Sequence, residues 1–149
     1  MNRADQITIL LVEDNPDHAT LTMRALHKGN LLNDVVWVKD GAEALDFLYR
    51  RGAYETPPAP RPGLILLDIK LPKVDGHGVL RQIKSDEALR TIPVVMLTTS
   101  AQADDVNGSY GAGANSFITK PVSFADFMEK INAVQLYWVL TNVPPGGVR

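Results

Sequence analysis

The chain contains no cysteine. Disulfide frameworks, thiolate zinc sites and cysteine nucleophiles are therefore excluded. Long hydrophobic runs are also missing, because the apolar segment 7–12 is too short for a signal sequence or a membrane span. We therefore expect neither secretion nor insertion into a membrane. The lack of cysteine is compatible with the reducing cytoplasm, where we expect the protein to act.

An excess of charge of one sign is missing as well. The 15 Lys and Arg residues nearly balance the 17 Asp and Glu residues, and the formal net charge is −2. Binding to nucleic acid requires clustered Lys and Arg residues, whereas charges of both signs are interspersed along this chain. We therefore expect no nucleic-acid partner. The length of 149 residues, with 45% hydrophobic residues, fits one globular domain. We expect residues 1–149 to form that domain, with a core at about 6–138 and a C-terminal tail at 139–149.

Five short apolar segments alternate with segments of helical periodicity. The periodicity is clearest at 124–138, and Ala103, Val106 and Tyr110 indicate the helix before it. This alternation predicts an α/β fold, a doubly wound sheet of five parallel strands with five helices on its two faces. Segment 51–62 carries four prolines and is predicted to be an exposed loop. The predicted strands are 7–12, 35–38, 64–67, 93–97 and 116–119.

Polar side chains follow four of the predicted strands. In parallel sheets of this kind, ligands bind beyond the carboxyl ends of the strands. Three neighbouring carboxylates at such an edge would repel one another, and a divalent cation would remove the repulsion. We therefore expect Mg²⁺, which prefers oxygen ligands. The residues at these strand ends are Glu13, Asp14, Asp68, Thr98 and Lys120.

The expected magnesium ligands come from two strand ends. Asp14 and Asp68 are placed to bind the ion directly, and Glu13 is better placed to hold a bound water. The backbone carbonyl of Lys70 is a further candidate oxygen, because it lies two residues after Asp68. Carboxylate, carbonyl and water oxygens together are a usual magnesium ligand set.

The same residues suit phosphoryl transfer. A carboxylate beside magnesium can attack a phosphoryl donor and become an acyl phosphate, and Asp68 is the candidate. Lys120 can bind a phosphoryl oxygen through its ammonium group, and Thr98 can donate its hydroxyl to another. Because phosphoryl transfer needs mainly positioning and charge compensation, these groups form one coherent set.

The motifs around these residues resemble those of bacterial response-regulator receiver domains. The resemblance implies a flavodoxin-like sheet with strand order 2-1-3-4-5, Asp68 as phosphoacceptor, and Glu13 with Asp14 as the magnesium acid pair. It implies that Thr98 is the switch hydroxyl, Lys120 the phosphate-sensing lysine and Phe117 the switch aromatic, with a cis bond before Pro121. The motifs are Val12-Glu13-Asp14-Asn15, Leu66-Leu67-Asp68-Ile69-Lys70-Leu71-Pro72, Asp75-Gly76, Leu97-Thr98-Thr99-Ser100 and Thr119-Lys120-Pro121.

The proline-rich insert, the Thr98 motif and the tail with Tyr137 and Trp138 are similar to those of single-domain response regulators of phytochrome-type histidine kinases. The resemblance implies a sensor histidine kinase as partner, with a bacteriophytochrome as the narrower choice. The apolar residues 137–140 extend beyond what a last helix needs, and an exposed apolar patch marks a contact surface, so we expect a homodimer or a partner contact through the C-terminal segment. Lys70 and Ser100 stand where receiver domains vary, and we expect them to set the rate of autodephosphorylation. The protein would then be a regulatory phosphoacceptor and not an enzyme acting on other substrates.

Other readings of the sequence stay open. The chain could be a receiver-like interaction module that no longer switches, or a phosphorelay intermediate that passes its phosphoryl group onward. A phosphohydrolase would carry a second aspartate where Lys70 stands, and a nucleotide-binding domain would carry a glycine-rich loop after Val12. We interpret His18, His27 and His77 as surface residues, because their spacing fits no metal site.

Overall fold

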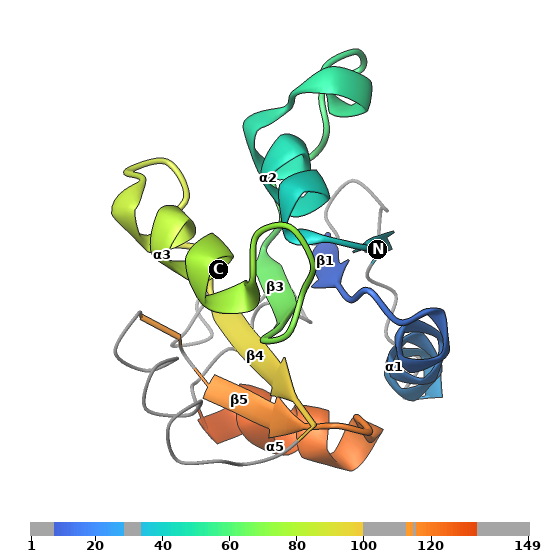
Figure 1. Cartoon of the computed structure of the whole chain (residues 1–149). Coiled ribbons are helices and arrows are strands. Elements are labelled where there is room, and N and C mark those ends of the chain that lie inside the picture. The colour runs from blue at the N-terminus through green and yellow to red at the C-terminus, as the bar shows by residue number, and fades with distance from the viewer. Residues whose placement is uncertain (1–7, 29–33, 100–112, 115, 134–149) are drawn as a thin grey trace, which may run out of the picture.

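The structure is a computed structural model and describes residues 8–28, 34–99, 113–114 and 116–133. Its centre is a parallel sheet of five strands in the order β2-β1-β3-β4-β5, as predicted (Figure 1). Among the described residues, no helix is long and apolar enough to cross a lipid bilayer. The strands are β1 (Ile9–Val12), β2 (Val35–Val38), β3 (Leu64–Asp68), β4 (Val94–Thr98) and β5 (Ser116–Thr119).

Four α-helices and one 3₁₀ helix are present in the described part of the chain. The predicted helix marked by Ala103, Val106 and Tyr110 lies outside that part, as does the end of the predicted 124–138 helix. The helices are α1 (Pro16–Lys28), α2 (Gly41–Tyr49), the 3₁₀ helix η2 (Gly52–Tyr54), α3 (Gly76–Ser85) and α5 (Phe124–Ala133).

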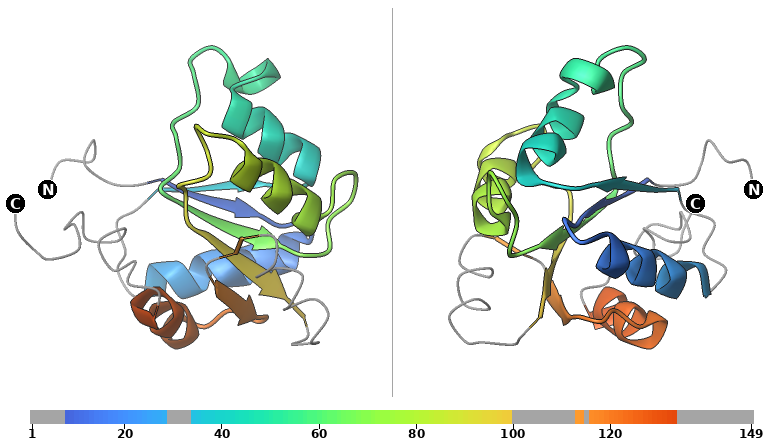
Figure 2. Two further views of the ribbon diagram at one scale, coloured as in Figure 1. Left: turned by 90° about the vertical axis from the view of Figure 1, so that its left-hand side faces the viewer. Right: turned by 45° about the vertical axis from the view of Figure 1, so that its right-hand side comes forward.

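The helices cover both faces of the sheet, because alternate residues of each buried strand point to opposite faces. Helices α2 and α3 pack on one face, against Leu10, Ile65 and Met96. Helices α1 and α5 pack on the other face, against Leu11 and Leu66. Figure 2 shows the sheet between these two pairs of helices. The core therefore has two apolar layers, and the strands β1, β3 and β4 between them are fully buried.

Strand β4 starts one residue later than predicted, at Val94 instead of Pro93. Proline has no N–H to give to a neighbouring strand, so it suits the position just before a strand. The Pro93 carbonyl still accepts a hydrogen bond from the Ile65 N–H at 3.0 Å. Pro93 therefore supports the sheet through its acceptor alone.

The proline-rich insert is mostly exposed, as predicted, but it is not wholly irregular. It begins with η2, and the Tyr54 ring stacks edge-on against Phe47 of α2, with ring centroids 5.1 Å apart. The Tyr54 hydroxyl donates to Glu43 Oε2 at 2.6 Å, and Arg50 Nε donates to the Ala59 carbonyl at 2.8 Å. The insert is thus fastened to α2.

Candidate functional site

The parallel register brings the predicted site residues to one edge of the sheet. Val12 pairs with Leu67, Asp68 with Leu97, and Thr98 with Thr119. The strands β1, β3, β4 and β5 therefore end side by side, and the residues that end or follow them meet. Carboxylate oxygens of Glu13, Asp14 and Asp68 lie within 4.8 Å of one another.

Lys120 lies at the centre of this edge. Its Nζ is 2.7 Å from Glu13 Oε1 and 3.1 Å from Asp68 Oδ2. The Lys120 side chain is only 6% exposed. Lys120, which follows β5, thus links the end of β1 to the end of β3 through one ammonium group. Lys120 and Glu13 are 107 residues apart in the sequence.

Glu13 is fully buried, and both of its carboxylate oxygens are engaged. Oε1 accepts from Lys120, and Oε2 accepts from the Asn15 N–H at 3.1 Å. Burial raises the Glu13 pKa to about 7, with Asp68 adding to the rise while the Lys120 and Asn15 hydrogen bonds oppose it. Asp14, the next residue, is exposed. Of the two neighbouring acids, Glu13 is therefore buried in the protein and Asp14 faces solvent.

Asp68 ends a fully buried strand and is itself 4% exposed. Its Oδ1 accepts from the Lys70 N–H at 3.2 Å. The chain then returns in a tight loop, because the Gly76 N–H donates to the Ile69 carbonyl at 2.9 Å. Gly76 packs so closely on the Asp68 carbonyl that a Cβ there would overlap it. The start of α3 is thereby held against the strand end that carries Asp68.

An open hollow adjoins Asp14 and the loop after Asp68. It has a volume of about 380 Å³. It leaves this edge of the sheet open to solvent beside Asp14. Its lining residues are Asp14, Ile69, Lys70, Leu71, Pro72, Asp75 and His77.

Thr98 and Phe117 occupy neighbouring strands at the same edge. Thr98 is 4% exposed, and its carbonyl accepts from the Lys120 N–H at 2.6 Å. Phe117 is half-buried, and the Lys130 Nζ lies 5.2 Å from its ring centroid. The bond between Lys120 and Pro121 is cis. The backbone contact with Thr98 fixes where the Lys120 side chain begins.

Two contacts at this edge were not predicted from the sequence. His18, which we interpreted as a surface residue, is half-buried, and its Nδ1 is 3.1 Å from Lys120 Nζ. Trp37 Nε1 donates to the Glu13 carbonyl at 2.7 Å.

The strand order defines a flavodoxin-like α/β fold. The three carboxylates and the lysine at the carboxyl ends of the strands form a candidate metal and phosphoryl site. The chain matches the response regulator receiver domain over residues 9–132. It therefore belongs to that family, whose members are regulatory proteins of two-component signalling and partners of sensor histidine kinases.

Individual relatives cover nearly the whole chain. It is 45% identical to the probable methanogenesis regulatory protein FilR2 of Methanothrix harundinacea, over 95% of this chain and 90% of that protein. The solved bacteriophytochrome response regulator AtBRR is 48% identical, with a TM-score of 0.82, over 89% of this chain and 95% of that one.

A third relative was solved with a metal ion. The response regulator Rcp1 of Synechocystis is 39% identical over 92% of both chains. The structure of its Mn²⁺-bound form has a TM-score of 0.74 and covers 91% of this chain and 96% of that one.

Proposed function

We propose that the protein takes a phosphoryl group from a sensor histidine kinase onto Asp68 and changes a protein-contact surface as a result. The observation that carries the proposal is the Lys120 ammonium, which bonds Glu13 and Asp68 at the same time. An ammonium in that place can compensate charge on a phosphoryl group attached to Asp68. The hollow beside Asp14 supplies the approach.

A divalent cation fits the same edge. Three carboxylates face one lysine there, so negative charge exceeds positive charge, and oxygen is the ligand that Mg²⁺ prefers. We propose Glu13, Asp14, Asp68 and the Lys70 carbonyl as the groups that hold it, directly or through water. The Mn²⁺ in Rcp1 supports this assignment. When bound, the cation would neutralise charge on the transferring phosphoryl group.

In the transfer, an oxygen of Asp68 forms a bond to phosphorus. The bond between phosphorus and the kinase's histidine nitrogen breaks, and its electron pair leaves with the imidazole. Lys120 and Thr98 compensate charge on the phosphoryl oxygens through an N–H and an O–H. The burial of Asp68 and Lys120 strengthens this compensation, because charges interact more strongly away from water.

The switch follows from the same contacts. A phosphoryl group adds charge and strong acceptors beside Thr98 and Lys120. We propose that Thr98 moves toward it and that Phe117 fills the space that Thr98 leaves. Phe117 suits this role because it is half-buried on β5, between the core and solvent. The contact surface that changes is formed by the predicted helix before β5, by β5 and by α5. That predicted helix lies outside the described residues.

The partner and assembly are also proposals. A phytochrome-type kinase is supported by the 48% identity to a bacteriophytochrome response regulator. We propose that residues 1–149 form one domain. We also propose that two copies of the chain form a homodimer through the C-terminal segment. A cytoplasmic location is expected, because histidine kinases draw their phosphoryl groups from ATP.

The phosphoryl group also has to leave. We propose that water hydrolyses the acyl phosphate, which returns the Asp68 carboxylate and releases inorganic phosphate. Lys70 lines the open hollow near Asp68, so it lies on the route that water would take. Ser100, the second residue proposed to set this rate, lies outside the described residues.

Incubation with acetyl phosphate, with and without Mg²⁺, tests the proposal. Intact mass should rise by one phosphoryl group only with Mg²⁺, and Asp68→Asn should abolish the gain. The matched control is Glu87→Gln, an exposed acid after α3, which should be labelled like the wild type. Light scattering on the same samples reports self-association. Labelling of Asp68→Asn, or none of the wild type, would reject Asp68 as the acceptor.

A further inference from the structure

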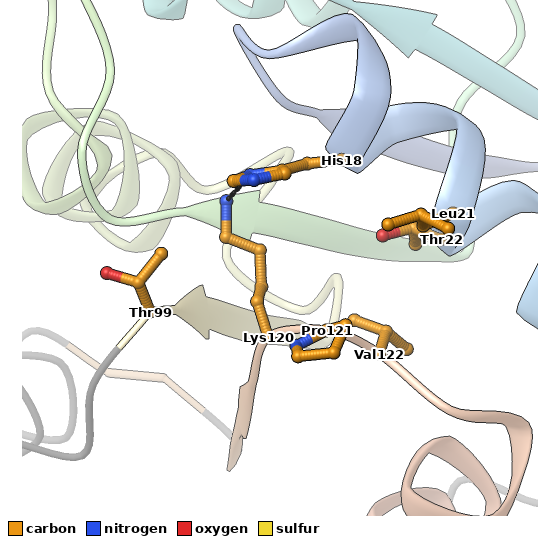
Figure 3. A pocket seen from close by; sticks show the side chains of 7 residues that line it. All are labelled: His18, Leu21, Thr22, Thr99, Lys120, Pro121 and Val122. Carbon is orange, nitrogen blue, oxygen red and sulfur yellow. Dashed lines mark hydrogen bonds between the residues drawn. The ribbon is translucent and has the colours of Figure 1, made fainter.

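The contact between Lys120 and His18 has no part in the proposed phosphoryl chemistry. An ammonium carries three N–H donors, and Lys120 Nζ has three acceptors in the described structure. Two are the carboxylates of Glu13 and Asp68, and the third is His18 Nδ1 at 3.1 Å. Figure 3 shows the lysine side chain reaching from below toward the His18 ring.

The three acceptors differ in what phosphorylation does to them. Asp68 becomes an acyl phosphate, and Glu13 belongs to the proposed metal site. Both carboxylates therefore change their bonding during the reaction cycle. The imidazole is neutral when its Nδ1 accepts a hydrogen bond, with the ring proton on Nε2. His18 is the one acceptor that neither the phosphoryl group nor the cation takes away.

Local structure places His18 for this contact. Asn15 caps α1, and its Oδ1 accepts from the N–H groups of Asp17 and His18 at 2.9 and 3.2 Å. The cap fixes the backbone of the first helical turn, and with it the point from which the His18 side chain starts. His18 also lines a pocket of about 140 Å³ together with Leu21 and Pro121. The ring therefore contacts the Lys120 ammonium and also borders this pocket (Figure 3).

We infer that His18 is a positioning residue that holds the Lys120 ammonium at the phosphoryl site while its two carboxylate partners change their bonding. The inference rests on the proposed role of Asp68 and Lys120. It adds a function for the imidazole, namely to keep one N–H of the ammonium occupied so that the other two point toward Glu13 and Asp68. Without His18, Lys120 loses one of the three contacts that fix its direction.

Two substitutions separate this role from simple packing. In His18→Asn the side-chain oxygen can take the place of Nδ1, because the first atoms of the two side chains have similar geometry. In His18→Leu a side chain of similar bulk remains but the acceptor is lost. His27→Leu is the control, since His27 is an exposed histidine in the last turn of the same helix.

The assay is the initial rate of Mg²⁺-dependent phosphoryl uptake from acetyl phosphate, followed by intact mass. A small donor is used so that a contact between α1 and a kinase cannot contribute. Loss of a hydrogen bond to a charged group should slow His18→Leu by about tenfold. His18→Asn should remain near the wild-type rate, and His27→Leu should match it.

A spectroscopic measurement on the unphosphorylated protein completes the test. Nitrogen-15 chemical shifts of His18 should show an unprotonated Nδ1 in the wild type and a mixture of tautomers in Lys120→Met. Uptake by His18→Leu at the wild-type rate, or equal slowing of His18→Asn and His18→Leu, would overturn the inference and leave the proposed function standing. If the wild type takes up no phosphoryl group, both fall together.

Discussion

The two ends of the sheet each hold a lysine whose ammonium is turned into the protein, and the two differ in what surrounds them. At the carboxyl end, Lys120 bonds the side chains of Glu13, Asp68 and His18. At the amino end, Lys84 of α3 donates to the backbone carbonyls of Arg90 and Ile92 at 3.0 and 2.8 Å. Burial lowers the pKa of Lys84. One lysine thus meets charged side chains and the other meets neutral backbone.

We propose that this difference separates a structural lysine, Lys84, from the lysine of the phosphoryl site, Lys120. Backbone carbonyls keep their place as long as the chain is folded, so the two acceptors of Lys84 stay fixed in the folded protein. Carboxylate side chains can turn, bind a cation or be esterified, so the partners of Lys120 can change without unfolding. A buried carboxyl group with a raised pKa beside a specific charged partner, such as Glu13 beside Lys120, is typical of functional sites. Four predictions test this contrast.

The largest effect is expected for phosphoryl uptake in Lys120→Met. Loss of a preorganised positive group at a phosphoryl site costs roughly 100-fold or more in rate. Lys84→Met, the same substitution at the opposite end of the sheet, should leave uptake unchanged. Both rates follow from intact mass with acetyl phosphate and Mg²⁺. Equal rates in the two variants would remove the contrast between the two ends.

The second prediction concerns the cation. Mg²⁺ at about a hundred times its dissociation constant should raise the melting temperature by roughly 5–10 °C. Asp14→Asn should lose most of this shift, because it removes the exposed member of the acid cluster. Lys84→Met should keep it. Thermal unfolding with and without Mg²⁺ measures each shift, and an undiminished shift in Asp14→Asn would remove Asp14 from the site.

The third prediction concerns the stability of the fold, for which Lys84 is the lysine of interest. Lys84→Met should lower the free energy of unfolding by about 1–3 kcal/mol, because two backbone carbonyls lose a charged donor. The melting temperature would fall without any change in the rate of phosphoryl uptake. Urea unfolding monitored by circular dichroism gives the free energy. Lys84→Arg is the matched variant, and retained stability there would show that the charge matters more than the shape of the ammonium.

Much of this contrast could be predicted from the sequence at one end of the sheet and little at the other. Glu13, Asp68, Thr98 and Lys120 were predictable because each directly ends or follows an apolar strand, and parallel strands align their ends. The order of the strands followed from the resemblance of the motifs. The role of Lys84 was not predictable, since a lysine in a helix is usually a solvated residue.

The contacts of His18 and Trp37 were missed for a related reason. They join residues 102 and 24 positions apart in the chain. Whether such side chains meet depends on how α1 is rotated against the sheet and on how β2 twists at its edge. Both are set by packing of the two core layers, which periodicity does not give. Sequence patterns therefore indicated the candidate site residues but not the side chains that contact them.

The smallest effect is expected where the proline-rich insert (51–62) contacts α2, a region with no proposed role in phosphoryl uptake. Burial, with the hydrogen bond to Glu43, raises the pKa of Tyr54 from 10.0 to about 12. Because the unfolded chain ionises this phenol first, stability is fully present below pH 10 and is lost as the pH rises toward 12. Tyr54→Phe keeps the ring against Phe47 but removes the titrating group.

Wild-type protein should therefore exceed Tyr54→Phe in stability by about 1 kcal/mol at pH 8, and the advantage should shrink at pH 11. Urea unfolding at both pH values measures the two differences, and the rate of phosphoryl uptake at pH 8 should be the same in both proteins. A constant difference across the two pH values would mean that the phenol does not titrate differently on folding. A change in the rate of uptake would mean that the contact between the insert and α2 affects the site at the carboxyl ends of the strands. The insert could then not be described as purely structural.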